Sequence, residues 1–180
     1  TAVKTVEEER RRVDQLREVV DGSNIGTKKV VAVGRLSFKV DKFTSRMNDD
    51  DLVYSPYFYT HSNGYKLRLE VYPGGYGEDR GSQMSVYISI CKGEYDDVLS
   101  WPCKYLITVA VVNQLTNEAH ETHIISYCSR FKEYFIKPIK GDNPGYGSPS
   151  FISHKDLLSI EGLLVDESVL LQIAFNPPPL

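Results

Sequence analysis

The clearest pattern of apolar and polar positions in the chain is a strict alternation between residues 65 and 72. The two sets are Tyr65, Leu67, Leu69 and Val71 on one side and Lys66, Arg68, Glu70 and Tyr72 on the other. A period of two with one apolar face predicts a half-buried antiparallel strand. The aromatic segment 54–60 precedes it, and Ser62-Asn63-Gly64 between them predicts a turn. We therefore expect two paired strands whose charged face is open to a partner.

Alternation or β-branched runs recur along the rest of the chain. They predict further strands at residues 30–33, 36–40, 84–91, 105–113, 121–126 and 169–175. The connections are polar or rich in glycine and proline, among them a loop at 45–51 and a turn-rich stretch at 140–149. A single helical turn capped by Ser153 is expected at 153–158. The pattern predicts an all-β domain, residues 30–180, folded as an antiparallel sandwich of seven or eight strands.

Residues 1–21 differ from the rest, because they are mostly charged and contain no glycine or proline. Val6, Val13 and Val20 recur every seven residues, and Leu16 falls at a matching d position, with Glu9 as a charged flaw. This heptad seam predicts a coiled-coil helix at 1–21 that self-associates through Val6, Val13, Leu16 and Val20. A solvated surface helix remains the alternative, since three heptads are too few to exclude it. Gly22 ends the helix, and residues 22–29 form a linker.

The composition restricts the class of protein further. The 180 residues carry a net charge of −3, with 41% hydrophobic and 25% charged residues, which suits one globular domain with an appendage. No basic footprint for nucleic acid is present, and no apolar run approaches the roughly 20 residues of a membrane helix. We expect neither nucleic-acid binding nor membrane insertion. Three widely spaced cysteines indicate reduced thiols and a cytoplasmic location.

Motifs of enzymes and metal sites are missing from the sequence. There is no Gly-x-Ser-x-Gly elbow, phosphate-binding loop or His-Glu-x-x-His motif. His120 and His123 fall on opposite faces if they lie on a strand, so a satisfied or exposed histidine is expected there rather than a metal ligand. The acidic run 49–51 lacks the glycine and distal glutamate of a calcium loop. We expect no catalytic activity, no metal and no cofactor.

Short blocks of sequence, taken in order and with their spacing, resemble the TRAF domain (tumour necrosis factor receptor-associated factor), a MATH-type sandwich. The resemblance covers about residues 30–175 and rests on the blocks at 55–60, 64–67, 80–81, 92–96, 99–102, 113–114, 135–138, 143–147 and 151–152. It implies an eight-stranded antiparallel sandwich on a trimeric coiled coil. Members are cytoplasmic signalling adaptors that bind short extended peptides from receptor tails or signalling partners. The scaffold then includes Ser55-Pro56 and Trp101-Pro102.

The resemblance also implies a peptide site at the sheet edge formed by residues 144–148. The positions that match the family's groove are Glu70, Tyr72, Tyr76, Tyr87, Lys132, Tyr134, Phe135, Pro144, Tyr146, Gly147 and Ser148. Tyr87 and Phe135 suit a core position equally well, and Gly147 suits a turn. The runner-up function is a MATH module that recruits substrates for a ubiquitin-pathway enzyme. The heptad helix before the sandwich favours the adaptor.

The sequence departs from the family pattern at the predicted groove. Glu70 and Tyr76 stand where many members have arginine and aspartate, and residues 132–134 replace the three serines of one subgroup. We expect Glu70 near solvent, which predicts a neutral or basic peptide residue facing it, because like charges repel. Alternatively, Arg68 or Lys132 turns inward and restores a preference for acidic peptides.

Overall fold

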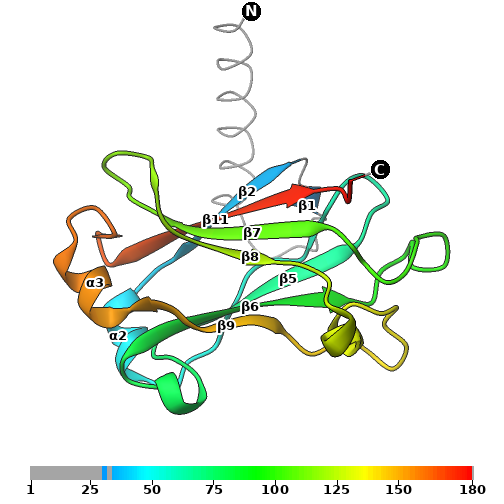
Figure 1. Cartoon of the computed structure of the whole chain (residues 1–180). Coiled ribbons are helices and arrows are strands. Elements are labelled where there is room, and N and C mark those ends of the chain that lie inside the picture. Colours follow the sequence, from blue (N-terminus) through cyan, green and yellow to red (C-terminus); the bar gives the residue numbers. More distant parts are fainter. Residues whose placement is uncertain (1–29, 32–33, 180) are drawn as a thin grey trace, which may run out of the picture.

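Two β-sheets pack face to face in the computed structural model, which describes residues 30–31 and 34–179 (Figure 1). Sheet A has the strand order β1-β4-β5-β6-β9, with β3 also paired to β5. Sheet B has the order β10-β11-β7-β8, with β2 also paired to β11. The predicted coiled coil, its four trimerisation residues Val6, Val13, Leu16 and Val20, and the linker 22–29 lie outside the described residues.

Sheet A consists of β1 (Val30–Val31), β3 (Val53–Tyr54), β4 (Phe58–Tyr59), β5 (Lys66–Tyr72), β6 (Gln83–Cys91) and β9 (Tyr146–Ser153). Sheet B consists of β2 (Arg35–Val40), β7 (Leu106–Val112), β8 (Ala119–Ile125), β10 (Leu164–Val165) and β11 (Ser168–Asn176). The helical segments are α2 (Phe43–Asn48), α3 (His154–Ser159) and the 3-10 helices η1 (Gly77–Asp79) and η2 (Ser129–Tyr134). In the described part of the chain, no helix is long and apolar enough to cross a membrane.

The predicted sandwich is confirmed, with seven strands of six residues or more among the described residues. The same residues include four two-residue strands: β1 falls within the predicted strand 30–33, β3 and β4 fall at the predicted aromatic strand, and β10 was not predicted. β1 pairs with β4 in parallel rather than antiparallel. The aromatic segment 54–60 forms β3 and β4 instead of one strand. Pro56 separates them because proline has no N–H for the ladder. The preceding residue, Ser55, instead accepts the Leu69 N–H at 2.9 Å with its hydroxyl.

Helix α2 includes residues 45–48 of the segment 45–51 for which a loop was predicted, so that prediction was wrong for these residues. Phe43 at its start is fully buried, and its N–H donates to the Glu167 carbonyl at 2.9 Å. Phe43 is the one buried side chain among the six residues of this helix, so the sequence shows no apolar repeat at helical spacing that would have predicted it. The predicted turn at α3 is confirmed, with the Ser153 hydroxyl accepting the Asp156 N–H at 3.0 Å.

The alternation that predicts β5 also divides its side chains between the core and the outside. Leu67, Leu69 and Val71 are completely buried between the sheets. We call the opposite side of sheet A, turned away from sheet B, its outer face. Lys66, Arg68, Glu70 and Tyr72 lie on this face and are half-buried. The outer face of β5 therefore carries the residues of β5 that were predicted to meet a partner.

Candidate functional site

Strand β9 is an edge strand of sheet A. Within the described residues it pairs only with β6, and its register places Tyr146, Gly147 and Ser148 opposite Ile88, Tyr87 and Val86. Pro149 follows, and prolines are common on sheet edges because they block further pairing. His123 of β8 bonds the Phe151 carbonyl at 3.0 Å and packs on its ring, so it is the satisfied histidine that was expected. The part of the edge left open is the predicted stretch around residues 146–148.

Neighbouring residues of β9 point to opposite faces, and this divides the predicted site in two. Gly147 lies opposite Tyr87 on the outer face of sheet A. Tyr146 lies opposite the buried Ile88 and Ser148 opposite the buried Val86, so both point to the inner side. A chain added alongside β9 would meet one group of residues on each face.

On the outer face, three tyrosines from β5, β6 and the connection between these strands pack together. The ring centroids of Tyr72 and Tyr76 are 4.9 Å apart, and those of Tyr72 and Tyr87 are 5.9 Å apart at right angles. Tyr76 and Tyr87 meet edge to face at 6.0 Å. Tyr76 remains 55% exposed. We call these three residues the tyrosine shelf.

The connection that carries Tyr76 is held in place by backbone contacts. The Tyr76 N–H donates to the hydroxyl of the buried Ser85 at 2.9 Å, and this hydroxyl donates in turn to the Pro149 carbonyl. Gly75 has a φ of +87°, and a Cβ there would lie 2.5 Å from the Gln83 carbonyl oxygen, so only glycine fits. The shelf is therefore formed before any ligand binds.

Glu70 is covered, which corrects the expectation that it faces solvent. Its side chain is 15% exposed, accepts the Ser89 hydroxyl, and lies 3.6 Å from the Arg68 guanidinium. Gly145 lies over it so closely that a Cβ there would be 2.9 Å from a Glu70 carboxylate oxygen. Any group placed outside Gly145 would therefore meet the charge of Glu70 through its field rather than by direct contact.

Arg68 already has partners on the same face, so it does not reach the shelf. Its guanidinium lies 3.9 Å from the Tyr54 ring centroid and 5.3 Å from that of Tyr57, whose hydroxyl accepts from it at 3.2 Å. Asp142 is 3.9 Å away. Lys132 is exposed on η2, and the alternative in which it turns inward stays a prediction.

On the inner side, Tyr146 packs among the aromatic residues of η2 and its end. Its ring centroid lies 5.1 Å from that of Tyr134, 5.2 Å from that of Phe135 and 5.8 Å from that of Phe131. Phe135 is only 3% exposed, which agrees with its reading as a core residue. Phe131 was not predicted, although its spacing of three and four residues from Tyr134 and Phe135 suits one helical face. We call Phe131, Tyr134 and Tyr146 the aromatic wall; Pro144 is exposed just before it.

The electrostatics of the shelf are dominated by burial and by nearby carboxylates. Burial raises the pKa of Tyr72 above its usual value of 10, and Glu70 is the largest charged contributor to the same shift. Burial likewise raises the pKa of Tyr87, with contributions from Tyr72, Tyr76 and Asp79. Each cause disfavours a negative charge on the rings, so the phenols stay neutral.

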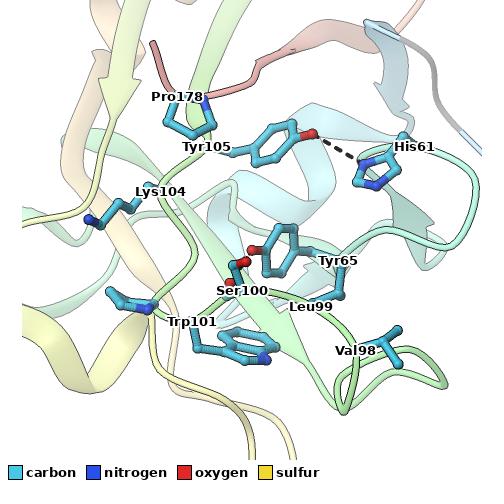
Figure 2. A pocket seen from close by; sticks show the side chains of 10 residues that line it. His61, Tyr65, Val98, Leu99, Ser100, Trp101, Lys104, Tyr105 and Pro178 are labelled. Carbon is cyan, nitrogen blue, oxygen red and sulfur yellow. Dashed lines mark hydrogen bonds between the residues drawn. The ribbon is translucent and has the colours of Figure 1, made fainter. Parts of the chain in front are cut away.

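A second concave region, of about 410 Å³, lies away from β9 between the turn after β4 and the connection from β6 to β7 (Figure 2). His61 and Tyr105 share a hydrogen bond of 3.2 Å there, and the Tyr65 hydroxyl donates to the Ser100 carbonyl. The Trp101 indole donates to the Asp96 carbonyl at 2.8 Å. These polar groups bond to one another and join two connections, which agrees with the scaffold role expected for Trp101-Pro102.

Taken together, the geometry defines a β-sandwich whose open edge strand is flanked by aromatic residues on both faces. The sequence matches the MATH domain over residues 35–175. The chain therefore belongs to the MATH-domain family.

Among curated proteins, the chain is similar to several TNF receptor-associated factors. It is 28% identical over 125 residues to TNF receptor-associated factor 5 of Mus musculus, covering 69% of this chain and 22% of that protein. It is 27% identical over 122 residues to TNF receptor-associated factor 2 of Homo sapiens, covering 67% of this chain and 24% of that protein. The chain thus spans about a quarter of the length of these relatives.

A solved structure titled Notothenia coriiceps TRAF5 has the same fold. It superposes with a TM-score of 0.78 at 20% identity, covering 99% of this chain and 87% of that one. At this identity the likeness establishes the fold. The antiparallel sandwich expected from the sequence is thereby supported by an independent comparison.

Proposed function

We propose that this chain is the peptide-binding module of a cytoplasmic signalling adaptor, which docks short extended peptides from receptor tails or signalling partners on β9. The observation that carries the proposal is the open stretch of β9 at residues 146–148, with the tyrosine shelf on one face and the aromatic wall on the other. The relatives are named as receptor-associated factors, which favours this function over substrate recruitment for a ubiquitin-pathway enzyme.

The binding mode is the addition of a strand to the sheet edge. Main-chain hydrogen bonds to β9 supply affinity, and alternate peptide side chains meet the two faces. Large aromatic residues dominate the energetics of many interfaces, so Tyr146 is the expected anchor of the wall. No step of this function needs a metal, a cofactor or catalysis by the chain.

A peptide array probed with the purified chain tests the proposal, followed by titration of the best peptide. Replacing Tyr146 by Ser should weaken binding at least about tenfold, equivalent to about 1.4 kcal/mol. Val98→Ser is the matched control, because Val98 is 80% exposed in the connection between β6 and β7, and it should bind normally. An array without binders, or equal affinity for the Tyr146 variant, would refute the proposal.

We also propose that the adaptor is a homotrimer joined through the heptad positions Val6, Val13, Leu16 and Val20. Three linked modules would hold a clustered receptor more tightly than one, because later binding events become intramolecular. Light scattering of residues 1–180 against residues 28–180 measures this directly. A monomeric long form at micromolar concentration contradicts the trimer.

A further inference from the structure

The tyrosines on the outer face of sheet A differ in whether a cation of the same chain covers them. Tyr54 has the Arg68 guanidinium 3.9 Å from its ring centroid, and Tyr57 has the Lys66 ammonium at 4.2 Å. Among the residues that the structure describes, no lysine or arginine lies over Tyr72, Tyr76 or Tyr87. Tyrosine ring faces attract cations, so the shelf keeps an unused capacity for one.

The charges around the shelf favour a positive ligand. Glu70 and Asp50 act on Tyr72, and Asp79 acts on Tyr87. Arg80, on the same connection as Tyr76, lies 3.3 Å from Asp50 in an exposed ion pair. Arg68 offsets part of the Glu70 charge at 3.6 Å, whereas Asp79 has no ion pair among the described residues. The field at the rings therefore stays negative, which attracts a cation and repels an acidic group.

Next to the rings, the edge strand carries a residue without a side chain. Gly147 lies opposite Tyr87, and a Cβ there would be 2.1 Å from the Val86 carbonyl oxygen, so β9 approaches β6 closely and Gly147 adds no side chain beside the ring. In a strand added to β9, the residue beside Gly147 would point to the outer face, and its two neighbours would point to the aromatic wall. The fixed connection around Gly75 and Ser85 means that little ordering is needed on binding.

We propose that the tyrosine shelf selects a lysine or arginine side chain of the bound peptide, at the position beside Gly147. This inference rests on the proposed function of β9. The preferred peptide then has a basic residue flanked by apolar or aromatic residues. The ammonium or guanidinium lies on the exposed face of Tyr76, within the field of Glu70 and Asp79, and the peptide backbone pairs with β9.

The test uses the full chain and an oriented library of acetylated extended peptides. One position carries arginine, lysine, trimethyl-lysine, norleucine or glutamate, and affinities are measured by calorimetry. Arginine, lysine and trimethyl-lysine should each bind about five- to tenfold more tightly than norleucine, with glutamate the weakest. Trimethyl-lysine donates no hydrogen bond from its charged group, so its preference separates attraction to the rings from hydrogen bonding.

Variants of single tyrosines locate the effect. Tyr76→Leu should remove the preference for arginine over norleucine, whereas Tyr76→Phe, which keeps the ring, should retain it. Tyr54→Leu is the matched control, since its ring is already covered by Arg68, and the preference should be unchanged. Thermal unfolding of each variant checks the fold.

The outcomes distinguish the two proposals. The proposed selectivity of the tyrosine shelf is overturned if peptides bind β9 without a preference for a basic residue, or if this preference survives in Tyr76→Leu. Either result leaves the proposed function of β9 intact. Failure of every peptide in the library to bind would overturn both.

Discussion

Two groups of tyrosines share the outer face of sheet A, and their surroundings differ. Tyr54 and Tyr57 remain 48% and 40% exposed, but a cation of the same chain, Arg68 or Lys66, already covers a face of each ring. We call this end of the face the closed end, because its cation positions are occupied. Tyr72, Tyr76 and Tyr87 pack on one another near carboxylates, and in the described part of the chain no lysine or arginine covers their rings. We call this the open end. The residue type is the same in both groups. The difference teaches that a tyrosine on this face belongs to the scaffold where the chain supplies a cation and to the candidate site where it does not.

The largest expected effect concerns thiol chemistry at the closed end. Cys91 lies opposite Lys66 and is completely buried. Burial, followed by nearby Asp142, raises its pKa to about 12 from an ordinary 9, although Arg68 and Lys66 act in the other direction. Since the thiolate is the nucleophile, Cys91 should react about a thousandfold more slowly than an ordinary thiol at neutral pH.

A cysteine placed at the open end provides the comparison. In a Cys128→Ser background, a Tyr76→Cys substitution should be labelled rapidly by a thiol reagent, while Cys91 stays unlabelled until the protein unfolds. Mass spectrometry of timed samples measures both rates. Similar labelling rates would mean that Cys91, which lies opposite Lys66 at the closed end, is as accessible to the reagent as position 76.

The second effect concerns stability. Arg68→Ala removes the cation from Tyr54 and leaves the covered Glu70 carboxylate with the Ser89 hydroxyl but without its cationic partner. We expect a loss of about 2–3 kcal/mol in the free energy of unfolding, because an unpaired buried charge is costly. Arg80→Ala is the control: its ion pair with Asp50 is exposed and should cost less than about 0.5 kcal/mol. Urea unfolding compares them, and equal losses would contradict the difference between the two ends.

The smallest effect is a shift in tyrosine ionisation. Because the pKa values of Tyr72 and Tyr87 are raised in the folded protein, their contribution to stability is complete below pH 10 and is lost as the pH rises above this value. A bound trimethyl-lysine peptide should lower both pKa values, since a cation favours tyrosinate. Nuclear magnetic resonance of labelled tyrosine rings, with Tyr72→Phe for assignment, follows the titration. If the tyrosine titration curves are identical with and without the peptide, the bound cation does not lie near these rings.

Some features of the candidate site could be predicted from the sequence, and others could not. The alternation along β5 placed Glu70 and Tyr72 on the outer face, and the family resemblance placed the edge at residues 144–148. The covering of Glu70 by Gly145 and Ser89 was not predictable, because these contacts join residues far apart in the chain. Helix α2 was missed for the same reason, since its buried anchor Phe43 is held by the distant Glu167 carbonyl.

The sequence by itself determined the sandwich, because the period of two in a strand is a local property of the backbone, legible from the order of side chains. Only the tertiary structure decided which tyrosines are closed and which are open. Arg68 reaches Tyr54 because β3 pairs with β5 in a register that sets Tyr54 opposite Glu70. Tyr76 joins Tyr72 and Tyr87 because the Ser85 hydroxyl holds its connection in place. Register and long-range hydrogen bonds depend on contacts between distant segments, and these contacts place the cations of this face.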